Sequence, residues 1–147
     1  MRLMKIKQLS IFLQNKMGSL FVPLEVLADA GVNIRAMCMA DTSEFGILRL
    51  VVDNPEKGKE VLEKNNFLVK ITEIIGVAMD DTPGGLTAVL KIIKDNSIDL
   101  EYLYAFSTSD IGKATLMLHT EDIDKLLDVL KENDIYIIPA EFVHKLP

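Results

Sequence analysis

Hydrophobic residues alternate with polar ones along several stretches of the chain, and between these stretches they recur every three or four positions. Alternation predicts strands, and the longer spacing predicts helices with one buried face. The predicted strands span residues 6–13, 32–40, 47–52, 68–79, 98–106, 113–119 and 135–138. The predicted helices span about 20–31, 54–66, 86–93 and 120–130.

Local signals place some of the helix ends. Asn54 followed by Pro55 is a strong helix start, because the asparagine can cap the helix and proline suits its first position. Thr120 is the expected cap of the last helix, and Gly31 is expected to stop the first. Pro23 lies inside the first predicted helix, so its first turn should begin late or be kinked.

The order strand–helix–strand–strand–helix–strand occurs twice, with the stretch 68–79 ending one unit and opening the next. This order predicts an α+β protein with two ferredoxin-like βαββαβ units, each an antiparallel sheet with helices on one face. We expect the units to pack as one body, with the domains at residues 1–73 and 74–147.

A direct repeat supports this division. The segment 13–20 recurs 66 positions later as 79–86, and the same offset relates 32–34 to 98–100 and Gly46 to Gly112 without a gap. A fixed internal period indicates a duplicated supersecondary unit. Any binding site is then expected where equivalent loops of the two units face each other.

Charge and composition exclude several classes of partner. The 147-residue chain has a formal net charge of −6 and no basic stripe, which argues against nucleic acid. No apolar run approaches the ~20 residues of a membrane span, so no membrane partner is expected. Cys38 is the only cysteine, which favours a reducing, cytoplasmic location and a role as a small core residue.

Catalytic and metal-binding patterns are absent from the sequence. The two histidines, His119 and His144, lie far apart in the sequence, and no serine has nucleophile-elbow spacing. No Cys/His cluster has the spacing of metal ligands. The acidic residues at 121, 122 and 124 fall at a helix start, where the helix dipole already explains them. We therefore expect no enzyme activity, no cofactor and no metal.

Two glycine-containing loops are the strongest candidates for a binding site. Each joins a strand to a helix, where backbone N–H groups and the helix dipole favour a carboxylate or phosphate. Asn15 and Asp81 could cap the following helix or bind a ligand's ammonium group, and a capped turn without a ligand is the alternative. Two polar turns and an aromatic strand could also contribute. The candidate ligand-binding residues are Asn15, Met17, Gly18, Ser19, Leu20, Asp81, Pro83, Gly84, Gly85, Leu86, Asp41 and Tyr104.

The loop pattern [D/N]-x-P-G-x-L within a βαββαβ unit resembles the ACT domain, and the duplication resembles the stand-alone tandem ACT-domain proteins. The segments 31–36, 40–49 and 101–106 also carry this resemblance, which covers essentially the whole chain. It implies a regulatory module that binds small effectors, most often amino acids, between paired domains. Such modules control enzymes such as aspartate kinase or phosphoglycerate dehydrogenase.

The sequence departs from the ACT pattern at three positions. Met17 replaces the loop proline of the first unit, Pro23 interrupts the helix after it, and Ser97 replaces the glycine expected after the helix of the second unit. The first two departures concern the first loop, and the third concerns a helix end of the second unit.

Other functions on this fold fit the residues less well. An acylphosphatase-like enzyme needs an arginine in the first loop, which offers only Lys16, and a metal chaperone needs paired cysteines there. An RNA-recognition module needs basic residues beside its aromatics, but Tyr102 and Tyr104 neighbour Asp99 and Glu101. A structural dimerisation module with degenerate pockets remains an alternative.

The predicted strand faces also indicate assembly. Tyr102, Tyr104 and Phe106 could form the core under the helices, or could line an interface or a pocket. Alternation places Met37 and Met39 on the face opposite the row 32–40, together with Arg35. Methionine-rich faces often serve as adaptable contacts, so we expect a homodimer.

Overall fold

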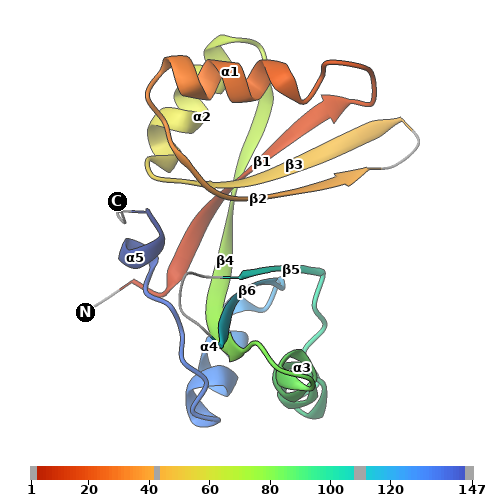
Figure 1. Ribbon diagram of the computed structural model, residues 1–147, viewed down its shortest axis with the longest axis vertical. Coiled ribbons are helices and arrows are strands. Elements are labelled where there is room, and N and C mark those ends of the chain that lie inside the picture. The colour runs from red at the N-terminus through yellow and green to blue at the C-terminus, as the bar shows by residue number, and fades with distance from the viewer. Residues whose placement is uncertain (1–2, 42–43, 108–111, 145–147) are drawn as a thin grey trace. The chain divides into compact units, whose positions relative to one another are not determined.

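The computed structural model describes residues 3–41, 44–107 and 112–144 (Figure 1). The strands in this part of the chain are β1 (Lys5–Gln14), β2 (Ile34–Asp41), β3 (Phe45–Val52), β4 (Leu68–Asp80), β5 (Tyr102–Ser107) and β6 (Lys113–His119). The helices are α1 (Phe21–Asp29), α2 (Pro55–Lys64), α3 (Gly85–Asp95), α4 (Ile123–Glu132) and α5 (Ala140–His144). The α+β class and the two ferredoxin-like units are confirmed.

The strands follow the order β2-β3-β1-β4-β6-β5, and the two central strands belong to both units. One compact unit comprises Lys7–Thr72 with Glu141–Pro147, and the other comprises Met1–Ile6 with Glu73–Ala140. The expected shared stretch is therefore confirmed as β4, which passes from one unit to the other after Thr72. Each unit also takes a short segment from the opposite end of the chain, a detail that the predicted domains 1–73 and 74–147 do not contain.

The unit of Lys7–Thr72 buries its core between α1, α2 and one face of β1 and β3 (Figure 1). Alternate residues of the strands point to this face, as a half-buried sheet requires. Its fully buried leucines and isoleucines include Leu9, Ile11, Leu27, Leu48, Leu50 and Leu62. Burying one such side chain stabilises the fold by roughly 1.5–3 kcal/mol relative to exposing it.

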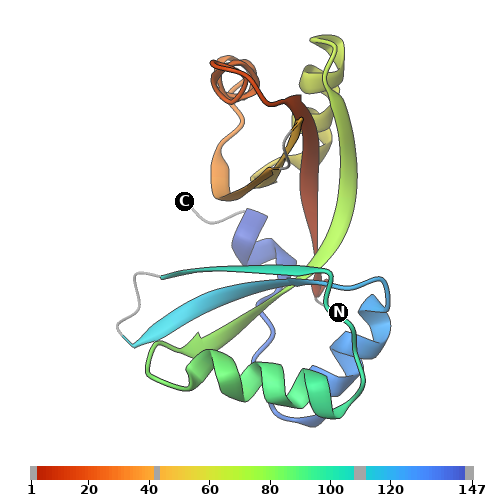
Figure 2. The same ribbon diagram turned by 90° about the vertical axis from the view of Figure 1, so that its right-hand side faces the viewer.

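The unit of Glu73–Ala140 repeats this arrangement with α3 and α4 on one face of β4 and β6 (Figure 2). The buried stripe of α3 is Val89 and Ile93, and that of α4 includes Leu126 and Leu130. The fully buried strand residues of this core are Ile75, Val77, Leu116 and Leu118. The apolar spacing predicted both helices and the face that each one buries.

The helix starts agree with the sequence in two of three cases. The Asn54 side chain accepts a hydrogen bond from the Lys57 amide at 3.2 Å, which confirms it as the cap of α2. Pro23 lies in the first turn of α1, where backbone N–H groups have no partner within the helix, so proline is tolerated there. The expected late start of this helix is confirmed. Thr120 is not the cap of α4: its hydroxyl donates to the Asp99 carbonyl at 2.8 Å, and Asp122 occupies the cap position.

All four long helices end with a residue in the left-handed region. The φ angles are 75° at Gly31, 67° at Asn66, 56° at Ser97 and 58° at Asp134. In each case the next amide donates back to the carbonyl five residues earlier, for example Ile98 to Ile93 at 3.2 Å. This is a Schellman ending, in which glycine is preferred because it has no β-carbon. Ser97 therefore keeps the backbone of the glycine that it replaces.

Ser97→Gly is expected to raise the free energy of unfolding by up to about 1 kcal/mol, because glycine relieves the left-handed penalty of a side chain. Chemical denaturation of both proteins measures the difference. Gly31→Ala is the matched control, since it introduces a side chain at the equivalent position with φ 75° and should lower stability by a similar amount. A Ser97→Gly protein less stable than the wild type would contradict this account.

A bulge in β2 overturns the predicted faces of this strand. Ile34 pairs with Val52, but Ala36 pairs with Val51, so Arg35 is the extra residue. Met37 and Met39 then pair with Leu50 and Leu48, and directly opposite residues share a face. The prediction that the two methionines lie opposite the helices was wrong; they lie on the helix side.

The same bulge moves Cys38 out of the predicted core. Cys38 pairs with Arg49 on the face opposite the helices and is partly exposed. The aromatic row of β5 also lies on the face opposite the helices, since Tyr102 pairs with His119 and Tyr104 with Met117. Tyr102 stacks on His119 with a centroid distance of 4.9 Å. These rings therefore do not belong to the core under α3 and α4.

The predicted last strand, 135–138, is reduced to a single bridge between Ile137 and Val77. The Ile138 amide donates to the Gly76 carbonyl at 2.8 Å, and the Ala78 amide donates to Tyr136 at 3.0 Å. Pro139 follows immediately and has no amide hydrogen, which explains why the pairing stops.

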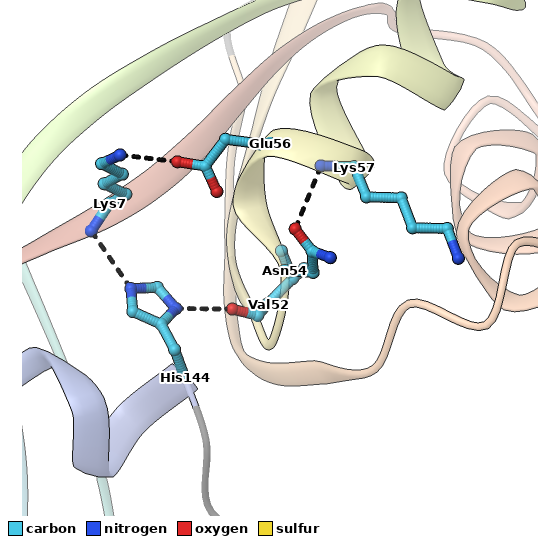
Figure 3. A network of polar contacts seen from close by, with 6 residues as sticks. All are labelled: Lys7, Val52, Asn54, Glu56, Lys57 and His144. Atoms are coloured by element: carbon cyan, nitrogen blue, oxygen red, sulfur yellow. Dashed lines mark hydrogen bonds and ion pairs between the residues drawn. The ribbon is translucent and has the colours of Figure 1, made fainter.

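Residues after Pro139 form α5, a short helix that the sequence reading missed, and its end docks on the unit of Lys7–Thr72 (Figure 3). His144 Nδ1 lies 2.6 Å from the Val52 carbonyl oxygen, and the Lys7 amide donates to Nε2 at 3.4 Å. The Arg35 guanidinium donates to the Val143 carbonyl at 3.1 Å. The bulged residue of β2 thus holds the C-terminal segment.

Beside this contact, the Lys7 ammonium pairs with the Glu56 carboxylate near the start of α2 (Figure 3). The hydrogen bond from Lys7 lowers the pKa of the Glu56 carboxyl. Both side chains are more than half exposed, so this ion pair contributes little to stability.

Candidate functional site

The first strand–helix loop leaves the end of β1 and enters α1. The Asn15 amide donates to the Glu44 carbonyl at 3.1 Å, which ties the loop to the residue just before β3. Gly18 has φ 83°, and no atom lies within 4 Å of the place that a β-carbon would occupy. The Phe21 amide then donates to the Gly18 carbonyl at 3.2 Å and begins the helical turn. The loop therefore presents an open backbone at a left-handed glycine.

Ser19 adds a polar group to this loop. Its Oγ is buried and is the one buried side-chain N or O atom without a hydrogen-bond partner among the residues that the structure describes. A buried hydroxyl without a partner is costly, so an ordered water or a ligand group is expected to accept its hydrogen bond. Leu20 occupies the cap position of α1 and gives no side-chain cap. A carboxylate at the helix start could accept a hydrogen bond from this hydroxyl.

The second loop leaves β4 and enters α3 with a similar backbone. Gly84 has φ 87° and, like Gly18, has no atom within 4 Å of a β-carbon position. The Gly85 amide donates to Thr82 at 3.0 Å, and the Asp81 amide donates to the Gly112 carbonyl at 2.8 Å. The two candidate loops therefore share a left-handed glycine at equivalent positions of the repeat.

The loops differ at the next position. A β-carbon on Gly85 would overlap the carbonyl oxygen of Asp80, so only glycine fits there. The equivalent residue in the first loop is Ser19. Whereas α3 begins at Gly85 itself, α1 begins at Phe21, two positions after Ser19. Gly85 is thus required by the backbone itself, whereas position 19 can hold a hydroxyl.

The predicted capping role of Asn15 and Asp81 was wrong. The cap positions of α1 and α3 are Leu20 and Gly84, and neither helix has a side-chain cap. Met17, Asp81 and Pro83 are exposed on their loops, while Leu20 and Leu86 are each exposed by more than a third. The polar groups that the sequence offered as caps therefore lie where a ligand could meet them.

Two further candidates lie on strands. The Asp41 backbone ends β2 opposite Gly46, and its side chain lies outside the described residues. Tyr104 lies in the middle of β5 on the face opposite the helices and is 9% exposed. The structure therefore does not place Tyr104 on the helix side of the sheet, where the second loop continues into α3.

Met39 is a neighbour of the first loop that the sequence reading missed. A β-carbon on Gly46 would overlap the Met39 methyl group, so the methionine lies over this glycine. Gly46 pairs with Leu13 at the end of β1, just before the loop begins. Only the bulge at Arg35 brings Met39 to this side of the sheet, and nothing in the local alternation signals that bulge.

A metal-binding group is not assembled among residues 3–41, 44–107 and 112–144. No group of three or more His, Cys, Asp or Glu side chains there could hold a metal ion. In the same residues, no helix is long and apolar enough to cross a membrane. The two loops carry backbone amides, the Ser19 hydroxyl, the polar side chains of Asn15 and Asp81, and apolar side chains.

Comparison with known proteins decides the family. The model of the family described as "ACT domain pair" matches residues 4–146. This chain belongs to the ACT domain pair family. The resemblance drawn above from the repeat and the two strand–helix loops is confirmed. No match was found among curated proteins.

Two solved structures are similar to this chain. Protein BT0572 from Bacteroides thetaiotaomicron is 38% identical, with a TM-score of 0.90 over 97% of this chain and 98% of that one. The regulatory subunit of aspartate kinase from Thermus thermophilus is 12% identical, with a TM-score of 0.62 over 88% of this chain and 93% of that one. The second likeness shows a shared fold alone.

Proposed function

We propose that this ACT domain pair is a regulatory protein that binds an amino acid at its strand–helix loops and has no catalytic activity of its own. The observation that carries the proposal is the unpartnered Ser19 hydroxyl beside the left-handed Gly18, at the start of a helix without a side-chain cap. The N-terminal end of a helix favours negative charge. A carboxylate there would accept the hydrogen bond that Ser19 lacks.

An amino acid has a second charged group, and each loop offers a place for it. The carboxylate would lie at the backbone N–H groups near Gly18 and Ser19, or near Gly84 and Gly85. The ammonium group would lie near Asn15 in the first loop or near the exposed Asp81 carboxylate in the second. Both loops are candidate sites, and the hydroxyl favours the first.

The regulatory part of the proposal rests on the similarity to a regulatory subunit. The regulatory subunit of aspartate kinase from Thermus thermophilus shares the fold, and no group of side chains that could hold a metal ion occurs among the described residues. We propose a homodimer in the cytoplasm that controls a partner enzyme. The structure removes one argument for the dimer, because Met37 and Met39 lie on the helix side of the sheet. A structural dimerisation module that binds no ligand is the competing function.

A thermal-shift screen of the twenty amino acids tests the function. A ligand present at 100 times its dissociation constant adds about 2.7 kcal/mol to the free energy of unfolding, which raises the melting temperature measurably. We expect at least one amino acid to do so, with the shift increasing as its concentration rises. If none of the twenty shifts the transition at millimolar concentration, the competing structural function is supported instead.

A further inference from the structure

We propose that the first-loop site selects amino acids with an uncharged, apolar side chain. This inference rests on the function proposed above and concerns the part of the ligand that lies beyond its carboxylate and ammonium groups. The observation is a row of two methionines, Met37 and Met39, on the helix-side face of β2, an edge strand of the sheet. This row begins beside the loop.

The position of Met39 is fixed by its neighbours. Its methyl group lies over Gly46, in the space that any side chain at position 46 would fill. Gly46 pairs with Leu13. Two residues after Leu13, the Asn15 amide donates to the Glu44 carbonyl at 3.1 Å. The tip of Met39 therefore lies at the end of the β1–β3 ladder, where the loop departs.

The methionines are open on a side of the sheet that is otherwise buried. Met39 is 40% exposed and Met37 is 45% exposed, although their partners Leu48 and Leu50 are fully buried. Exposed methionines are flexible and polarizable, so they adapt to an apolar group of varied shape. A ligand side chain that extends from the loop along this face would cover them and bury apolar surface.

Beside Met37 and Met39, a charged ligand side chain would meet apolar groups. The residues that flank this row on β3 are the apolar Leu48 and Leu50, and burying an unpaired charge against them is unfavourable. The charged residues nearest in sequence to the loop, Lys16 and Glu44, are both exposed.

The second unit repeats this chemistry at the equivalent positions. Leu103 and Ala105 correspond to Met37 and Met39, and they pair with Leu118 and Leu116 on the helix side of β6. Leu103 is 36% exposed, so this row is also open and apolar. The shorter alanine leaves more room beside an equally apolar row.

Titration calorimetry of the wild-type protein with leucine, methionine, lysine and glutamate tests the selection. We expect the better of the two apolar amino acids to bind at least tenfold more tightly than either charged one. Equal or tighter binding of lysine or glutamate would refute the selection while leaving the amino-acid-binding function intact. If none of the four binds, and the wider thermal-shift screen is also negative, both proposals fail together.

The variant Met39→Glu tests whether the ligand's side chain lies on this face of the sheet. The change should weaken leucine binding at least tenfold, because it puts a carboxylate where the ligand's apolar side chain would lie. Phe45→Glu is the matched control: it adds the same charge at an exposed position of the neighbouring strand, but Phe45 pairs with Gln14 on the opposite face. Unchanged binding in Met39→Glu, or equal losses in both variants, would refute the placement.

Discussion

Gly85→Ala is expected to lower the free energy of unfolding by at least about 1–3 kcal/mol, the usual range for overpacking. The new β-carbon would overlap the carbonyl oxygen of Asp80, which belongs to the backbone and cannot rotate away. Either the end of β4 or the first turn of α3 must therefore move. Urea denaturation monitored by circular dichroism measures the loss.

Ser19→Ala is the matched control for Gly85→Ala, because Ser19 is the equivalent residue of the first loop and already has a β-carbon. Its stability should equal or exceed that of the wild type, because the change removes a buried hydroxyl that has no hydrogen-bond partner. A Gly85→Ala protein as stable as the wild type would show that the second loop has a different backbone. Gly85→Val is accordingly no clean test of ligand binding, since it disturbs the loop itself.

Gly18→Val and Gly84→Val together are expected to weaken amino-acid binding by more than tenfold while the protein stays folded. At each position the β-carbon would point into open space in front of the loop, where the ligand's carboxylate is proposed to lie. A β-branched residue also resists the positive φ of these positions, at a cost of about 1–2 kcal/mol. Calorimetric titration of the double variant with the best wild-type ligand measures the loss.

Gly31→Val separates ligand contact from backbone strain. Gly31 has the same left-handed conformation, φ 75°, and equally open surroundings, but it lies at the other end of α1. It should destabilise the protein by an amount similar to either loop variant and leave the affinity unchanged. Unaltered binding in the double loop variant, or an equal loss in Gly31→Val, would count decisively against the loops as the site.

The elements and cores of both units could be predicted because they depend on local periodicity. The helix stripes ending at Ile93 and Leu130 and the cap at Asn54 need only neighbours along the chain. The left-handed Gly18 and Gly84 lie at equivalent positions of the repeat, so Met17 did not change this part of the first loop. The helix that contains Pro23 begins two positions later than its counterpart, as the proline predicted.

The faces of β2 could not be predicted because one extra residue, Arg35, reverses the alternation after it. The arginine is held by the Val143 carbonyl, more than one hundred positions away in the sequence, so no local pattern reveals the bulge. The aromatic row of β5 was uncertain for a related reason: alternation shows that residues share a face, but it does not show which face the helices cover.

Amide chemical-shift mapping with the amino acid that stabilises the protein most tests the central claim most directly. Titrating that amino acid into isotopically labelled protein reports each backbone N–H separately. The largest shifts are expected at Gly18, Ser19 and Leu20, at Gly84, Gly85 and Leu86, or at both loops. Saturable shifts confined to residues outside these loops, such as Tyr104 and Met117 on the opposite face of the sheet, would contradict the account.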